Sequence, residues 1–272
     1  MYMQKDDYVL YRRMWLRKGN SAEFDKLTDR DMRRVLRRGG GILVRNVYDF
    51  DTSAPTSFWY VIKDRFNGMD ELAPKTRWMV RRALKTLEIR RIDKAELVEA
   101  GAWEVFCRAF DHYKVKEGHI GDRGVFERGL LEMNDRTECW AAFDRQTGRL
   151  AAYAVNDVDS ISCGYASIKA DPEYLKWYYP IYGLIYEMNR HYLDERRLRY
   201  VSDGARSSTE HSNIQPWLEE KFGFRKAYCR LQVCCVWWLK IVIGVLYPFR
   251  RRIGNRRMCA LLRLEEMRRG AS

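Results

Sequence analysis

The sequence predicts a mixed α/β fold of the α+β kind, in which helices flank a twisted, mostly antiparallel sheet. One observation is the order of the predicted elements from residue 88 onward, β-α-α-β-β-β-α-β-α-β, with an antiparallel meander in the middle. A second is the stretch 200–238, where a strand, a polar loop, a short helix, a glycine and a final alternating strand follow one another. Each element can be justified in chain order.

Before residue 88, the sequence pattern predicts two helices and two strands. Three consecutive glycines follow the first helical pattern and end it, and a proline opens the second, where its missing N–H costs nothing. The predicted elements are a helix over 24–38, strands over 42–50 and 58–63, and a helix over 74–86.

The helix over 74–86 is strongly basic. Arg77, Arg81 and Lys85 recur at intervals of four and therefore lie on one side of it. Such a charge run is typical of a solvated face, and it can also face phosphate groups. Both interpretations stay open from the sequence.

The central region predicts the meander and the helices around it. Short apolar or alternating runs bounded by turn residues indicate strands, and apolar residues at helical spacing indicate helices. The predicted elements are strands over 88–92, 138–143, 150–155 and 160–168, helices over 95–110, 125–132 and 174–194, and a strand that begins at Tyr200.

The closing segment has clear start and stop signals. Ser212 or Asn213 can cap a helix over 214–222, and Gly223 ends it. Alternation over 227–235 then predicts a strand with one buried face. A helix that starts after a strand and a polar loop presents unpaired N–H groups, so this segment predicts a site for phosphate or carboxylate.

Composition narrows the class of partner. The 272 residues include 50 Lys and Arg against 37 Asp and Glu, a net charge of +13, which favours nucleic acid, acidic lipid headgroups or phosphorylated cofactors. The seven cysteines are odd in number and form no C-x-x-C, and the four histidines show no zinc-ligand spacing. We therefore expect reduced thiols, no metal and a cytoplasmic protein. The N-terminal residues lack the apolar core of a signal peptide, so export is not expected.

The apolar stretch 231–249, followed by Arg250, Arg251 and Arg252, leaves two membrane interpretations open. Its length makes it a candidate membrane span, although its first part alternates like a strand and Lys240 interrupts it. It can also lie on an anionic membrane surface, with its apolar side chains beside the basic cluster.

The element order, together with the closing segment SDGARSSTEHSNIQPWLEEKFGFRKAYCRL, resembles the GNAT acyltransferase superfamily. PKTRWMVRRALKTLEIRRI looks like the helix–strand entry of Fem-type aminoacyl transferases. The resemblance divides the chain into three parts. They are an N-terminal accessory or degenerate GNAT-like region over 1–87, a GNAT-like acyltransferase domain over 88–238, and a basic amphipathic C-terminal helical extension over 239–272.

The resemblance implies that the fourth strand of the domain, 160–169, separates from the fifth and leaves a V-shaped opening for the acyl donor. The usual acyl-CoA pyrophosphate loop, [RQ]-x-x-G-x-[GA], is absent, and KADPEYLKWYYPIYG stands in its place. This departure disfavours ordinary acetyl-CoA binding and suits a Fem-type relative, whose donor is a charged tRNA. The implied activity is transfer of an acyl or aminoacyl group from acyl-CoA or charged tRNA to a small-molecule or peptide amine.

Acyl transfer requires a group that takes a proton from the amine and groups that hold the donor. No Ser/His/Asp or Cys/His set is evident, which favours direct transfer without a covalent enzyme intermediate. The catalytic candidates are Asp203, His211 and Tyr165, and the cofactor-binding candidates are Lys169, Arg206, Ser207 and Asn213.

Each candidate also has a structural interpretation. Asp203 can deprotonate an amine or cap the loop beside Gly204, and Arg206 can bind an anion or remain solvated. His211 can act as an acid or base or be incidental, and Asn213 can bind the donor or cap the helix. Tyr165 and Lys169 are expected to line the V together, although a strand tyrosine is usually part of the core.

Two functions without catalysis compete with this hypothesis. The cations of helix 74–86 and the arginines after Phe249 can bind nucleic acid. Residues 237–252 can instead hold the protein on an anionic membrane.

Overall fold

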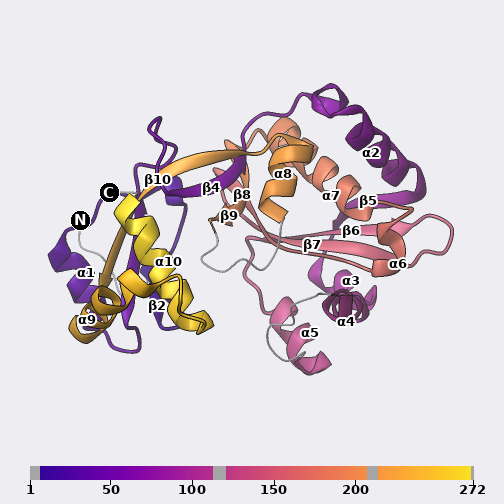
Figure 1. The fold of residues 1–272 in the computed structure, drawn as a ribbon. Helices are drawn as coiled ribbons and strands as arrows, with labels where there is room; N and C mark the ends of the chain where they lie inside the picture. Colours follow the sequence, from indigo (N-terminus) through magenta and orange to yellow (C-terminus); the bar gives the residue numbers. More distant parts are fainter. Residues whose placement is uncertain (1–6, 113–120, 207–213, 271–272) are drawn as a thin grey trace. The chain divides into compact units, whose positions relative to one another are not determined.

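The structure, a computed structural model, describes residues 7–112, 121–206 and 214–270, which form two compact units (Figure 1). The units do not follow the predicted boundaries at residues 87 and 238, because segments distant in the chain contribute to one core. Among the described residues, the first unit holds 7–61, 205–206 and 226–270, and the second holds 62–112, 121–204 and 214–225.

The first unit is built on strands from both ends of the chain. The strand order is β1 (Tyr8–Tyr11), β2 (Met14–Arg17), β3 (Leu43–Tyr48), β10 (Arg225–Cys235) and β4 (Phe58–Lys63). β1 and β2 form an antiparallel hairpin, β2 runs parallel to β3, and β10 runs antiparallel to β3 with Cys235 opposite Leu43. The sequence did not predict this hairpin.

The C-terminal helices are part of the core of the first unit. α9 (Trp237–Leu246) and α10 (Arg256–Gly270) bury Leu239, Ile243 and Leu262 against strand residues such as Leu43 and Phe58. The structure therefore gives residues 239–270 a packing role in this unit, where the sequence predicted an extension. α1 (Asp29–Leu36) covers a second, smaller cluster, and two short 3₁₀ turns, η2 (Ser21–Glu23) and η5 (Tyr247–Phe249), complete the unit.

The candidate membrane span is not a single element. Residues 231–249 comprise the end of β10, then α9 and then η5. Among the helices that the structure describes, none combines the length and the apolar character that a bilayer crossing requires.

The second unit contains the predicted meander. β5 (Leu87–Ile92), β6 (Thr137–Asp144), β7 (Leu150–Val158) and β8 (Ser162–Ala170) pair antiparallel in sequence order, and β9 (Tyr200–Ala205) pairs parallel with β8. This mixed, mostly antiparallel sheet flanked by helices confirms the predicted fold class.

Helices cover both faces of this sheet (Figure 1). α2 (Pro74–Thr86), α7 (Pro180–Asn189) and α8 (Ile214–Phe222) lie on one face, and α3 (Lys94–Glu99), α4 (Ala102–His112) and α5 (Arg123–Leu131) lie on the other. The remaining short elements are η3 (Gly68–Glu71), α6 (Pro172–Leu175) and the π-helical turn η4 (Arg190–Glu195).

Two predicted helices are interrupted by single backbone positions. Gly101, with a φ of 88°, separates α3 from α4 within the predicted helix 95–110. Tyr179, with a φ of 54°, precedes Pro180 and separates α6 from α7 within the predicted helix 174–194. A left-handed residue ends an α-helix, and the proline favours the start of the next one.

The packing of α7 depends on Gly183. A Cβ atom at this position would lie 2.4 Å from Ile89 Cδ1 and 2.9 Å from Ala83 Cβ. We expect Gly183→Ala to reduce the free energy of unfolding by about 1–3 kcal/mol, because α7 must move away from α2 and β5. Urea unfolding measures the change. Gly129→Ala in α5 is the control, since nothing lies within 4 Å of its added Cβ and alanine favours a helix; equal effects of the two substitutions would contradict the packing argument.

Candidate active site

The site is centred on the place where β8 and β9 part. Their parallel register comprises three pairs and ends with Gly164 opposite Ser202. β8 continues to Ala170 along β7, while β9 ends at Ala205. We call this separation after Gly164 and Ser202 the fork. The resemblance implied a V-shaped opening between these two strands, and that opening stays a prediction.

A β-bulge lies on β8 just inside the fork. Tyr165 is opposite Asn156 and Ser167 is opposite Val155, so Ala166 is the extra residue between them, and it is exposed. A bulge reverses the alternation of the side chains that follow it. Tyr165 and Lys169 therefore point to opposite faces of the sheet, and the expectation that they line one opening together was wrong.

Tyr165 lies in the core on the α7 side. Its side chain is 6% exposed, and its hydroxyl donates a hydrogen bond of 2.7 Å to Asn189 Oδ1. Burial raises the pKa of Tyr165 well above its usual value, so the hydroxyl stays protonated near neutral pH. This environment suits packing, and the predicted catalytic role of Tyr165 stays a prediction.

Lys169 lies on the α4 side. It is opposite Tyr153 in the register, and its Nζ is 6.0 Å from the centre of the Phe106 ring in α4. A cation over an aromatic ring is held by the negative charge of the ring face. A role for Lys169 in holding a cofactor stays a prediction.

Asp203 occupies the first β9 position beyond the last pair with β8. Its side chain is half-buried, and desolvation raises its pKa to about 6, while a hydrogen bond from Gln215 lowers it in part. Burial is the main cause that raises the pKa of Tyr165, and the charge of Asp203 adds to it. The alternative capping role is taken by Ser202, whose Oγ accepts a hydrogen bond from the Gly204 N–H at 2.9 Å.

Arg206 belongs to the first unit. Its guanidinium lies 4.3 Å from the centre of the Trp59 ring and donates a hydrogen bond of 2.7 Å to the Ser57 carbonyl. These contacts show that Arg206 is not simply solvated, and anion binding by this residue stays a prediction. The other three candidates, Ser207, His211 and Asn213, lie outside the described residues.

An aromatic pocket at the starts of α7 and α8 was not anticipated from the sequence. It has a volume of about 340 Å³. Trp217 and Tyr182 meet edge to face at 4.9 Å, and Trp217 Nε1 donates a hydrogen bond of 3.3 Å to the Tyr182 hydroxyl. Gln215, in the first turn of α8, donates a hydrogen bond of 3.5 Å to the carbonyl of Asp203, so the start of α8 adjoins the fork. The lining residues of the pocket are Leu175, Tyr179, Pro180, Ile181, Tyr182, Ile214 and Trp217.

An aromatic contact brings the basic face of α2 close to this pocket. Trp78 of α2 is 57% exposed and its ring meets Tyr179 at 5.5 Å. Arg82 Nε donates a hydrogen bond of 3.3 Å to the carbonyl of Trp177, which is 69% exposed. Arg77 instead donates to the carbonyls of Asp70 and Leu72, which distinguishes it from the exposed Arg81 and Lys85.

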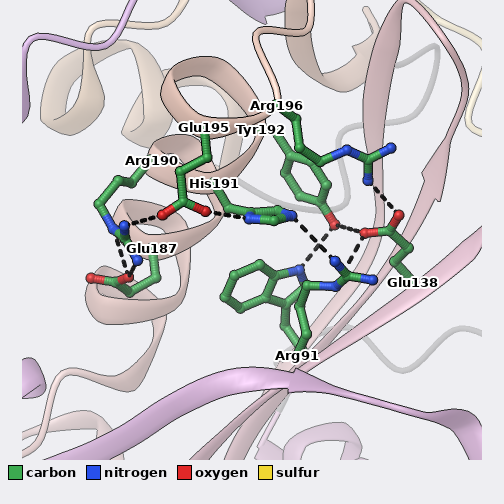
Figure 2. A network of polar contacts seen from close by, with 9 residues as sticks. Arg91, Glu138, Glu187, Arg190, His191, Tyr192, Glu195 and Arg196 are labelled. Carbon is green, nitrogen blue, oxygen red and sulfur yellow. Dashed lines mark hydrogen bonds and ion pairs between the residues drawn. The ribbon is translucent and has the colours of Figure 1, made fainter.

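A polar network fastens the end of α7 to the sheet (Figure 2). Tyr192 donates to Glu138 Oε2 at 3.0 Å and accepts from Trp140 Nε1 at 2.9 Å. His191 lies between two charged partners, with Nδ1 2.6 Å from Glu195 Oε2 and Nε2 3.4 Å from Arg91 Nη1. The network connects η4 to β5 and β6 and so fixes the helix whose first turn lines the aromatic pocket.

Comparisons with known proteins support the fold. No family model matches the chain, and no curated protein matches it. Among solved structures, FemX matches with a TM-score of 0.54 and 10% identity over 73% of each chain. The C-terminal domain of a putative lysylphosphatidylglycerol synthetase from Agrobacterium fabrum matches with a TM-score of 0.55 and 11% identity, over 88% of this chain and 84% of that one. The protein thus shares its fold with FemX and with this synthetase domain, in agreement with the fold that the sequence predicted.

Proposed function

We propose that the protein is an acyltransferase that moves an acyl or aminoacyl group from acyl-CoA or charged tRNA to an amine. The single observation that carries this proposal is Asp203, a carboxylate of raised pKa where two parallel strands separate. Perturbed carboxylates at such positions are candidates for general bases. The GNAT-like fold adds support at the level of the class of reaction.

The transfer is direct. The amine nitrogen attacks the carbonyl carbon of the donor while Asp203 accepts a proton from that nitrogen. The new carbon–nitrogen bond forms as the bond from the carbonyl carbon to the leaving sulfur or oxygen breaks, and the leaving group takes up a proton. A carboxylate with a pKa of about 6 is ionised near neutral pH and still more basic than an ordinary aspartate.

The neighbourhood of the fork favours a donor that carries a nucleotide. Aromatic side chains such as Tyr179 and Trp217 can stack on a base, and a cavity of about 340 Å³ admits one. Arg81, Lys85 and the exposed Trp78 offer the mixture of cations and aromatic rings that single-stranded RNA binds. These features support charged tRNA over acyl-CoA, for which the usual pyrophosphate loop is missing.

Radiolabelled donors test the proposal. The protein is incubated with a panel of acyl-CoAs and charged tRNAs and with amine acceptors, and transfer of label to the acceptor is measured. We expect transfer from charged tRNA, its loss in Asp203→Asn, and unchanged transfer in Asp135→Asn, which alters an exposed carboxylate in a turn. No transfer from any donor, or equal transfer by the two variants, would overturn the proposal.

A second candidate function is RNA binding without catalysis, which the exposed aromatic and basic residues of α2 favour. Binding of uncharged tRNA that weakens steeply with salt, with no label transferred from any donor, would favour this function. The double variant Arg81→Glu with Lys85→Glu in α2 tests this function, and we expect it to lose tRNA binding. Arg145→Glu in the β6–β7 turn is the control, and we expect it to retain tRNA binding.

A further inference from the structure

One surface of the first unit exposes large apolar side chains along α9 and η5. We call it the apolar ridge, and it consists of Trp237, Trp238, Ile241, Val245 and Phe249, with exposed fractions from 44% to 76%. The same helix buries Leu239 and Ile243 on its inner side. α9 is therefore apolar on its outer side as well, where a helix at the surface of a water-soluble unit normally carries charged residues.

A cationic groove adjoins the ridge. It has a volume of about 1060 Å³ and lies within the first unit, with Lys240, Ile243 and Gly244 of α9 among its lining residues. Apolar side chains such as Met32 and Val233 also line it. The charged residues that line it are six cations, Lys26, Arg33, Arg37, Lys240, Arg268 and Arg269, and two acids, Asp29 and Glu265.

The acids do not balance the cations of the groove. Glu265 is already engaged, since Arg268 Nη2 lies 2.7 Å and Arg269 Nε lies 2.9 Å from its Oε1. Three further arginines, Arg250, Arg251 and Arg252, follow the ridge directly in the sequence. The groove thus carries a net charge of +4 beside an apolar surface that no described part of the unit covers.

We propose that the first unit docks on an anionic phospholipid bilayer through this surface. The apolar ridge enters the boundary between headgroups and acyl chains, with the two tryptophans at the depth that indole rings prefer. The groove cations and Arg251 and Arg252 then face the lipid phosphates. A nucleic acid would satisfy the cations but would leave the ridge in water. The inference goes beyond the transfer reaction and does not depend on it.

Vesicle flotation of the full chain tests the docking. We expect the protein to float with vesicles of phosphatidylcholine and phosphatidylglycerol, to remain behind with phosphatidylcholine alone, and to lose binding as salt increases. The ridge variant replaces three of its five residues, with Trp238→Ser, Ile241→Ser and Val245→Ser. We expect this variant to lose flotation with the anionic vesicles. Arg251→Glu with Arg252→Glu should weaken partitioning by about fivefold or more for each position, since each cation near the surface contributes about 1 kcal/mol.

The matched control is Val125→Ser with Leu131→Ser, which removes exposed apolar side chains, 58% and 48% exposed, from α5 in the second unit. Circular dichroism and melting temperature show whether each variant folds. A measurement that needs no variant is quenching of tryptophan emission in the natural protein by lipids brominated on their acyl chains, which we expect for anionic vesicles only.

Three outcomes would overturn the docking. They are failure of the natural protein to float with anionic vesicles, flotation of the folded ridge variant equal to that of the control, and a stable dimer in solution that the ridge variant abolishes. Binding to RNA that requires the groove cations and is unaffected in the ridge variant, without vesicle binding, would assign the groove to nucleic acid instead.

Discussion

Replacing Asp203 by Asn is expected to reduce the transfer rate near neutral pH by about 100-fold or more, the usual loss when a general base is removed. The amide has nearly the shape of the carboxylate, so the fork geometry is retained while the group that accepts the proton is lost. Initial rates at saturating donor and acceptor measure the effect. A variant that keeps more than half of the natural rate would exclude Asp203 as the base.

The pH dependence gives a second measurement on the same residue. Because the pKa of Asp203 is about 6, the rate of the natural protein should fall as the pH decreases through about 6 and the carboxylate becomes protonated. The acid limb of the profile should be absent from the residual rate of Asp203→Asn. An unchanged acid limb in the variant would assign the titration to another group.

As the pH rises from about 4 to 6, the activity of the natural protein should increase while its stability decreases. The ordinary pKa of an aspartate is 3.8 and that of folded Asp203 is about 6, so the unfolded chain gives up this proton first as the pH rises. The contribution of Asp203 to stability therefore decreases between about pH 4 and pH 6 and stays lower above that window. Asp203→Asn should melt at the same temperature near pH 4 and at a higher temperature above pH 6, with a gain of at most about 3 kcal/mol.

Tyr192→Phe is expected to cause a large loss of stability. Tyr192 is fully buried, and its hydroxyl accepts from Trp140 Nε1 while it donates to Glu138 (Figure 2). It also accepts from Asn156 Nδ2 at 3.4 Å. Without the hydroxyl, the buried indole N–H has no acceptor, and we expect the free energy of unfolding to fall by about 2–3 kcal/mol. Chemical denaturation followed by circular dichroism measures it.

Tyr11→Phe is the control for this substitution, because the side chain of Tyr11 is 52% exposed and water can replace its contacts. Its effect should stay within about 0.5 kcal/mol. Equal small effects of both substitutions would show that the network of Figure 2 does not hold the end of α7.

Most of the strands and the fold class could be predicted from the sequence. The alternating residues of the meander and the start and stop signals of the helix over 214–222 depend on local patterns, and local patterns can be recognised in a sequence. The interruptions at Gly101 and Tyr179 each depend on one left-handed residue within a helical pattern. The hairpin of β1 and β2 has strands of only four residues, with mostly exposed or half-buried side chains, so it gave no clear pattern.

The candidate site was predicted only in part. Asp203 was proposed from its place at the end of the fifth predicted strand, and its catalytic role stays a prediction. The separation of Tyr165 from Lys169 depends on the bulge at Ala166, and a bulge of this kind has no sequence pattern that we recognised. The aromatic pocket joins α7 to Trp217 of α8, and this convergence arises only when the sheet is folded. The tyrosines of the segment YYPIYG were the one available signal.

The pairing of β3 with β10 sets an order of events during synthesis. Asn46 and Gln232, 186 positions apart, are joined by a hydrogen bond, so the N-terminal strands leave the ribosome long before their partner exists. Residues 62–204 emerge in between and contain the whole meander. Newly made β1, β2 and β3 therefore present an unpaired strand edge to chaperones until the last fifth of the chain is translated, and a nascent chain arrested before that point would be prone to aggregate through this edge.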